Sequence, residues 1–158
     1  MRKIYIGADS AGFHLKAELI PYIAEQGYEV VDCGTDSDAS CHYPEYAAAV
    51  CERVQKDPDS FGILVCGTGI GMSMAANKHR GIRAAVCGDT FSARFTRLHN
   101  DANVLCIGAR VIGAGLAKDI VDQFLSNGFE GGRHAVRVDM ITEIERRNYN
   151  SSQIVTLH

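Results

Sequence analysis

Short apolar runs of strand length alternate with segments of helical periodicity along almost the whole chain. In the first helical segment, Leu15, Leu19 and Ile23 recur at helical spacing until Gly27 ends the pattern. Parallel strands need crossover connections of this kind, and the crossover helices cover both faces of the sheet. The sequence therefore predicts an α/β fold built on a parallel sheet. Its five expected strands are residues 4–8, 29–32, 62–66, 83–87 and 104–108.

The segments between the later strands supply further helices. Asp89 can cap one of them, and we expect Phe91, Phe95 and Leu98 to form its apolar face. A last helix is expected around residues 141–144.

Composition and charge restrict the location and the partners. With 158 residues the chain is about one domain long, so we expect a single domain over residues 1–147 and a polar tail over 148–158. The formal net charge of −3 gives no basic footprint for nucleic acid, and no apolar run reaches the roughly 18 residues of a membrane span. The six cysteines occur singly, without a Cys-x-x-Cys pair, as in reduced cytosolic proteins. We therefore expect a cytoplasmic protein that binds neither nucleic acid nor membrane.

The most informative local sequence is the run 62–73, which reads as a strand, a glycine-rich loop and the start of a helix. Glycines let several backbone N–H groups turn toward one point, and the helix dipole adds partial positive charge there. The loop lacks the Lys-Ser/Thr of a nucleotide P-loop and does not complete Gly-x-Gly-x-x-Gly, although Asp89 could mimic the ribose-binding acid of that motif. An oxyanion or phosphate site and tight helix packing both explain the glycines.

Cys66 ends the strand at the edge of this loop. A lone cysteine in such a run is more often a small buried hydrophobe than a reactive group. A thiol beside converging N–H groups, however, can remove a proton next to a carbonyl while the N–H groups hold the developing enediolate oxygen. One short loop would supply both functions.

Four other residues have both a structural and a functional explanation. Asp9 follows the first strand and can cap a helix or bind hydroxyl groups. His99 can cap a helix C-terminus or transfer a proton to a sugar oxygen. Arg133 and Arg137 lie four residues apart, so on a helix they form either a solvated basic face or a fork for one phosphate. The remaining histidines show no metal-like clustering, and we assign neither a metal nor a cofactor.

Six groups of short motifs follow one another from about residue 4 to residue 147. They are Gly7-Ala8-Asp9 with Ala11-Gly12, Tyr43-Pro44 with Tyr46-Ala47, the loop Cys66 to Gly71, Ala75 to Lys78 with Gly81 to Ala84, His99 to Val104, and Gly131 to His134 with Arg137. In this order they resemble the ribose-5-phosphate isomerase B family, which also includes the two galactose-6-phosphate isomerase subunits. The likeness is closest to ribose-5-phosphate isomerase B.

The resemblance implies a fold and a reaction. The fold would be a Rossmann-like three-layer α/β/α sandwich with a five-stranded parallel sheet in the order 2-1-3-5-4. The protein would be a homodimer or homotetramer in which two subunits build each site. The reaction would be the aldose–ketose isomerisation of a phosphosugar through a cis-enediol, without a metal.

The resemblance also implies residue roles. Cys66 would move the proton between C2 and C1, because Met72-Ser73-Met74 stands where other members place a catalytic glutamate. Asp9, Thr68 and His99 would serve the sugar hydroxyls and ring opening. The remaining substrate-binding residues would be Ser10, Tyr43, Gly67, Gly69, Ile70, Gly71, Asn100, Arg110, Arg133 and Arg137, with the last three arginines on the phosphate.

One position departs from the family pattern. Ser10 stands where many members carry a phosphate-binding histidine, and a serine donates a hydrogen bond without adding charge. The polar loop 36–42 also faces the expected pocket. Ribose 5-phosphate is the favoured substrate, with allose or galactose 6-phosphate as alternatives, and a sugar-phosphate or nucleotide-binding module without catalysis is the alternative of another class.

Overall fold

The structure is a computed structural model and describes residues 1–149 of the chain. Its centre is a five-stranded sheet in the order β2-β1-β3-β5-β4, and every neighbouring pair is parallel. This confirms the expected α/β class and the strand order. The strands are β1 (Lys3–Ala8), β2 (Glu29–Asp32), β3 (Phe61–Cys66), β4 (Ala84–Val86) and β5 (Val104–Gly108).

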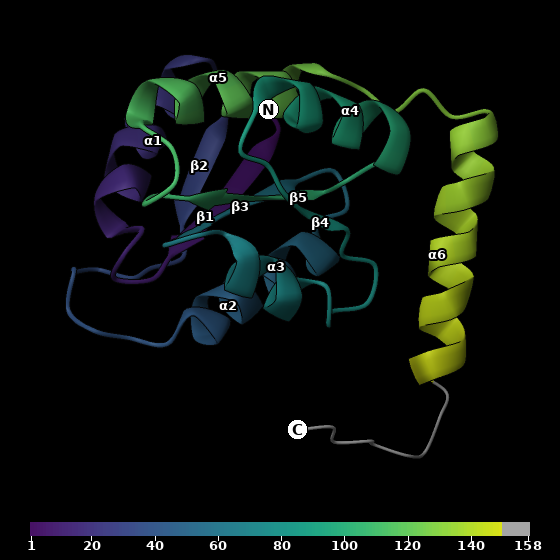
Figure 1. The fold of residues 1–158 in the computed structure, drawn as a ribbon, viewed down its shortest axis with the longest axis horizontal. Coiled ribbons are helices and arrows are strands. Elements are labelled where there is room, and N and C mark those ends of the chain that lie inside the picture. The colour runs from purple at the N-terminus through teal and green to yellow at the C-terminus, as the bar shows by residue number, and fades with distance from the viewer. Residues whose placement is uncertain (150–158) are drawn as a thin grey trace.

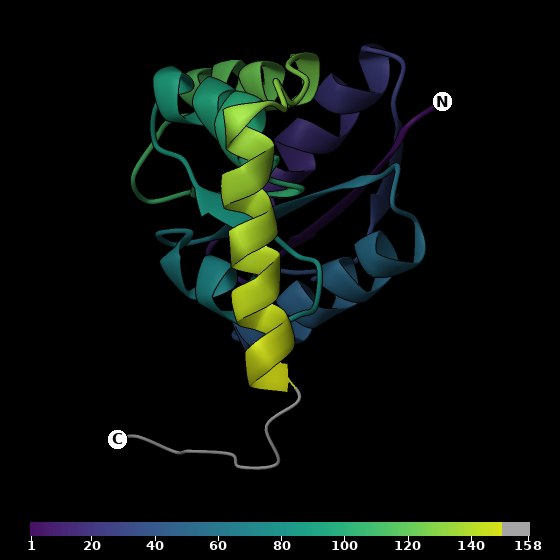
Figure 2. The same cartoon turned by 90° about the vertical axis from the view of Figure 1, so that its right-hand side faces the viewer.

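Helices cover both faces of the sheet (Figure 1). Helices α1, α4 and α5 lie on one face, and α2 and α3 lie on the other, which gives three layers. The sixth helix, α6, stands at one side and spans the height of all three layers (Figure 2). The helices are α1 (Phe13–Glu25), α2 (Tyr43–Lys56), α3 (Ile70–Ala76), α4 (Thr90–Asn100), α5 (Ala114–Ser126) and α6 (Arg133–Tyr149).

The central strand β3 is buried along its whole length. Ile63 and Val65 pack into the apolar cluster under α1, α4 and α5, whereas Leu64 and Cys66 pack into the cluster under α2 and α3. Successive side chains of a strand point to opposite faces, so a strand between two helical layers must be apolar at every position. This explains the uninterrupted apolar run that precedes the glycine loop.

The prediction of the face that α4 buries was wrong for Phe91, and Phe95 and Leu98 are only partly buried. The residues that α4 buries are Ala93, Thr96 and Arg97, while the Phe91 side chain is 69% exposed. Arg97 occupies the interior because its guanidinium lies 4.5 Å from the centre of the Phe61 ring and donates to the Asp101 carboxylate. These interactions offset the cost of burying its charge.

Helix α6 closes one side of the molecule. Near its C-terminal end, Glu145 accepts the backbone N–H of Gly81, which lies just beyond α3. A groove of about 930 Å³ remains between α6 and the body, with Ile141 and Ile144 of α6 on one wall and Ile82 on the other.

Of the expected polar tail, residues 148 and 149 belong to α6, and 150–158 lie outside the described residues. Within residues 1–149, no helix is long and apolar enough to cross a membrane.

Sequence patterns did not indicate the buried charge of Lys16 in α1. This side chain is 1% exposed, and its Nζ donates to Asp32 Oδ1 at 2.6 Å and to the Thr35 carbonyl oxygen at 2.7 Å. Asp32 Oδ1 also accepts the backbone N–H of Gly34. The lysine therefore ties the first turn of α1 to the start of the polar loop that follows β2.

We expect Lys16→Met to lower the free energy of unfolding by about 2 kcal/mol, because it leaves the Thr35 carbonyl and the Asp32 carboxylate without their partner. The half-exposed position of Asp32 keeps the loss below that of a fully buried pair. Urea unfolding measures the difference. Lys56→Met, at an exposed position on α2, is the control and should change stability by less than about 0.5 kcal/mol. Equal losses in the two variants would contradict a structural role for the buried ammonium group.

Candidate active site

The C-terminal edge of the sheet brings several of the expected site residues together. Asp9 follows β1, Cys66 ends β3, and Arg110 follows β5. The loops are joined by backbone hydrogen bonds, since Asp9 N–H donates to the Val65 oxygen and Arg110 N–H donates to the Gly67 oxygen. Ligands bind at this edge in open parallel sheets.

The Cys66 sulfur faces the backbone of the glycine loop. The Gly69 N–H donates to Cys66 Sγ at an N–S distance of 3.1 Å, and the cysteine is 5% exposed. Gly69 adopts a left-handed conformation with φ 79°, and a Cβ there would approach the Ile107 backbone to 3.0 Å. Glycine is therefore needed for the turn that aims this N–H at the sulfur, where it would stabilise negative charge.

The other buried cysteines lie in apolar surroundings. Burial raises the pKa of Cys51 to about 12 and that of Cys87 to about 11. Burial also raises the pKa of Cys106 well above its ordinary value. These three thiols stay protonated near neutral pH and act as small apolar side chains.

Tyr43 and Arg110 border the loop from two sides. A Cβ on Gly71 would lie 2.7 Å from the Tyr43 ring, so the ring at the start of α2 already occupies that space. On the other side, Arg110 Cδ lies 3.5 Å from the point where a Gly67 Cβ would stand. Both side chains thus contact the backbone that surrounds Cys66.

Asp9 stabilises the turn before α1 and does not cap the helix, whose N-cap is Gly12 without a side-chain hydrogen bond. Its Oδ1 accepts the N–H groups of Ala11 and Gly12 at 3.0 and 3.1 Å, which fixes the carboxylate at the entrance of α1. Thr68 Oγ1 accepts the Ile70 N–H at 3.2 Å, and Ser10 is partly exposed between β1 and α1. The Asp9 carboxylate still has Oδ2 for a ligand hydroxyl, so its role in this turn is compatible with hydroxyl binding.

The remaining expected site residues lie at the opposite end of the sheet in the same chain. His99 and Asn100 end α4, and the chain then reaches Asn103, whose carbonyl accepts the N–H of Gly62 at the start of β3. A strand the length of β3 spans roughly 17 Å, which separates this group from Cys66. Arg133 and Arg137 belong to the same distant group, because α6 starts beside the end of α4, where Glu130 N–H donates to the Leu98 oxygen. One chain therefore does not gather His99 and these arginines around Cys66.

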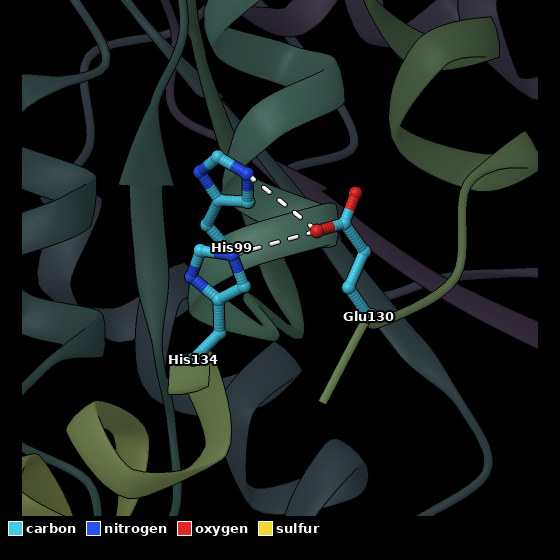
Figure 3. A group of neighbouring side chains, drawn as sticks. All are labelled: His99, Glu130 and His134. Atoms are coloured by element: carbon cyan, nitrogen blue, oxygen red, sulfur yellow. Dashed lines mark ion pairs between the residues drawn. The ribbon is translucent and has the colours of Figure 1, made fainter. Parts of the chain in front are cut away.

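This second group contains an arrangement that the sequence did not predict. The imidazole rings of His99 and His134 stack with centroids 4.0 Å apart and planes 10° apart. Glu130 Oε2 lies 3.8 Å from His99 Nε2 and 3.4 Å from His134 Nε2 (Figure 3). Burial and the neighbouring His99 lower the pKa of His134, so this ring stays neutral near neutral pH.

The same three residues are a candidate cation site, since their ligand atoms all lie within 4.8 Å of one another. Two histidines and one carboxylate form a donor set that zinc accepts. Because the rings are stacked, their in-plane lone pairs run side by side rather than converging on one point. The expectation that the histidines do not cluster was wrong for His134, because the contact between α4 and α6 depends on the tertiary fold.

The family model described as Ribose/Galactose Isomerase matches residues 4–141 of the chain. The chain belongs to this family. Among curated members, ribose-5-phosphate isomerase B of Escherichia coli is 51% identical over 147 residues, which cover 93% of this chain and 99% of that protein.

Solved structures of family members have the same fold. Ribose-5-phosphate isomerase B of Clostridium thermocellum superposes with a TM-score of 0.91 at 50% identity and covers 92% of this chain and 99% of its own. The type B enzyme of Trypanosoma brucei gives 0.88 at 43% identity, with coverages of 91% and 99%. The resemblance drawn from the motifs is thereby confirmed at the level of family and fold.

The conformation of Gly69 can be tested by comparison with a glycine elsewhere. Gly69→Ala should lower the free energy of unfolding by about 2–3 kcal/mol, combining left-handed strain with the clash against Ile107. Gly81 has a similar φ of 73° but no atom within 4 Å of an added Cβ, so Gly81→Ala should cost only the strain, about 1 kcal/mol. Chemical denaturation of both variants gives the comparison. If the losses are the same, close packing of the loop against β5 does not contribute.

Proposed function

We propose that this protein is an aldose–ketose isomerase that interconverts ribose 5-phosphate and ribulose 5-phosphate without a metal. The observation that carries the proposal is the hydrogen bond from Gly69 N–H to Cys66 Sγ within the glycine loop. It joins a candidate base to candidate oxyanion donors in a member of the Ribose/Galactose Isomerase family. The name of the Escherichia coli relative supports the pentose substrate.

In the proposed reaction the Cys66 thiolate removes the proton from C2 of the open-chain aldose. The electron pair of that C–H bond forms the C1–C2 double bond, and the former carbonyl oxygen becomes an enediolate oxygen. Backbone N–H groups of residues 67–71 hold this oxygen while its charge develops. The thiol then returns the proton to C1 while the O2 hydroxyl proton passes to O1, so a carbonyl forms at C2 and a hydroxyl at C1.

The side chains around the loop would orient the sugar. Asp9 Oδ2 and the Thr68 hydroxyl can bind sugar hydroxyls, and Ser10 and Tyr43 lie at the same edge of the sheet. We also propose that residues 1–147 act as one isomerase domain in the cytoplasm. Six cysteines without disulfides support a reducing location.

We propose that the site is completed by a second copy of the chain. His99, Asn100, Arg133 and Arg137 of one subunit would face the Cys66 edge of the other, in a homodimer or in a homotetramer built from two dimers. Two features support this: both arginines are exposed, and α6 also exposes the apolar side chains of Val136 and Met140. The arginines of one subunit would bring phosphate-binding positive charge to the Cys66 edge of the other subunit, where Ser10 adds no charge.

The serine also bears on the identity of the sugar. Ser10 leaves more room beside Asp9 than a histidine would, and the neighbouring loop 36–42 is mostly exposed. A longer substrate such as allose or galactose 6-phosphate is therefore the alternative within this reaction class. Kinetic comparison of the three phosphosugars decides between them through kcat/KM.

Catalysis by Cys66 can be tested by proton exchange. Wild-type protein should place solvent deuterium on ribose 5-phosphate and ribulose 5-phosphate in D₂O with a chelator present, and Cys66→Ser should lower turnover at least about a hundredfold. Cys33→Ser is the matched control. Cys33 follows β2, and its thiol donates to the Val31 oxygen instead of accepting an N–H of the glycine loop. Saturable binding of ribose 5-phosphate without deuterium exchange in the wild type would instead indicate a binding module. Near-normal turnover of Cys66→Ser would exclude the cysteine as the base.

A shared site can be tested by mixing two defective variants. Cys66→Ser and the double variant Arg133→Ala/Arg137→Ala should each be nearly inactive at low substrate concentration. After unfolding and refolding together, half of the dimers are mixed and carry one intact site, so about a quarter of wild-type activity should return. Each variant refolded alone is the control. If activity does not return although mixed dimers form, the cysteine and the arginines act within one chain.

A further inference from the structure

Glu130 restricts how the two stacked imidazoles carry their hydrogens. Its ionised carboxylate can only accept hydrogen bonds, and Oε2 lies near Nε2 of both His99 and His134 (Figure 3). At 3.8 and 3.4 Å neither contact is a hydrogen bond, but an acceptor oxygen beside both nitrogens favours a hydrogen on each Nε2. Nδ1 of His99 then carries the lone pair, points away from Glu130, and has no hydrogen-bonding partner within residues 1–149.

His99 is the more accessible ring of the pair, whereas burial and the neighbouring charges lower the pKa of His134. The His134 side chain is 9% exposed, whereas that of His99 is 35% exposed and can contact a ligand. Arg133 and Arg137 of α6 add positive charge near His134, and Glu130 is the carboxylate that opposes them. The neutral ring of His134 therefore packs against one face of the His99 ring.

The same charges disfavour a metal ion as the occupant of this group. Two arginines lie close by, and the lone pairs of the stacked rings do not converge. The arrangement of His99, Glu130 and His134 therefore does not suit a divalent cation bound between them.

We propose that Glu130 and His134 are positioning residues that hold the His99 ring with Nε2–H toward the carboxylate and present Nδ1 to the sugar. This inference rests on the proposed isomerase function. His99 Nδ1 accepts the proton of the anomeric hydroxyl and delivers it to the ring oxygen. The C1–O4 bond breaks as the C1 carbonyl forms, so the step opens the sugar ring and returns His99 to its starting state.

The substrate pair offers a way to isolate this step. Ribose 5-phosphate is mostly a closed furanose and must open before the C2 proton is accessible. Ribulose 5-phosphate cannot close a five-membered ring, because its O5 carries the phosphate. A defect in ring opening therefore slows isomerisation of the aldose but not solvent exchange at C1 of the ketose.

Four variants and one control test the positioning role, all in the presence of a chelator. Glu130→Met removes the acceptor and His134→Ala removes the stacked ring, and each should lower kcat for ribose 5-phosphate about tenfold, with KM changed less than about twofold. Glu130→Gln retains an acceptor oxygen and His134→Phe retains a flat ring, so both should recover much of the rate. The control Glu143→Gln neutralises a carboxylate of α6 that pairs with Arg146, and it should have no effect.

Two readouts separate positioning from a general structural defect. Deuterium exchange into ribulose 5-phosphate should stay within about twofold of wild type in all variants, because the Cys66 step is intact. Nitrogen-15 NMR of the ligand-free protein should show His99 with its hydrogen on Nε2 in the wild type and in Glu130→Gln, and a mixture of tautomers in Glu130→Met.

The outcomes also separate this inference from the proposed function. A wild-type protein that neither isomerises nor exchanges would refute the isomerase assignment. An active wild type whose Glu130→Met and His134→Ala variants lose aldose turnover and ketose exchange equally would refute the positioning role. An unchanged His99 tautomer in Glu130→Met would refute it as well.

Discussion

The parallel direction of all five strands is the constraint on which the rest of the structure depends. Every strand must end at the same edge, and the helix after it must return the chain to the other edge. This places Asp9, Cys66 and Arg110 together, since each follows or ends a strand. The same rule places His99 at the far edge, because it lies in the last turn of a returning helix. The division of the expected site into two groups is therefore a direct result of the sheet topology.

Close backbone packing then gives the Cys66 edge its chemical character. The left-handed turn at Gly69 brings the loop against β5 and directs an N–H at the cysteine sulfur. Burial in apolar surroundings, by contrast, raises the pKa of Cys51, Cys87 and Cys106. Cys66 differs from these thiols because a backbone N–H, that of Gly69, donates to its sulfur.

The far edge has a different physical basis. Its key contact joins α4 to the segment that leads into α6, and that contact stacks His134 on His99 beside Glu130. An acceptor oxygen of Glu130 beside Nε2 of both rings favours a hydrogen on each of these nitrogens. The second imidazole supports the first without competing for a proton, because burial keeps it neutral. In the proposed dimer, this edge would supply acid–base chemistry to a site whose base is on the other subunit.

The sequence by itself determined the strands, most of the helices, the parallel sheet and the family, because each depends on local periodicity or on ordered motifs. It also located Cys66 and the glycine loop, where strand end, thiol and turn are neighbours in the chain. It was wrong about the face that α4 buries. Contacts with the rings of Phe61 and Phe124 stabilise the buried guanidinium of Arg97, and Phe91 is exposed. Only the tertiary structure decided that His99 lies away from Cys66 and beside Glu130 and His134, and that Lys16 is buried against Asp32 and Thr35. Those contacts join segments far apart in sequence, and their energies depend on burial and direction, which no local pattern of residues encodes.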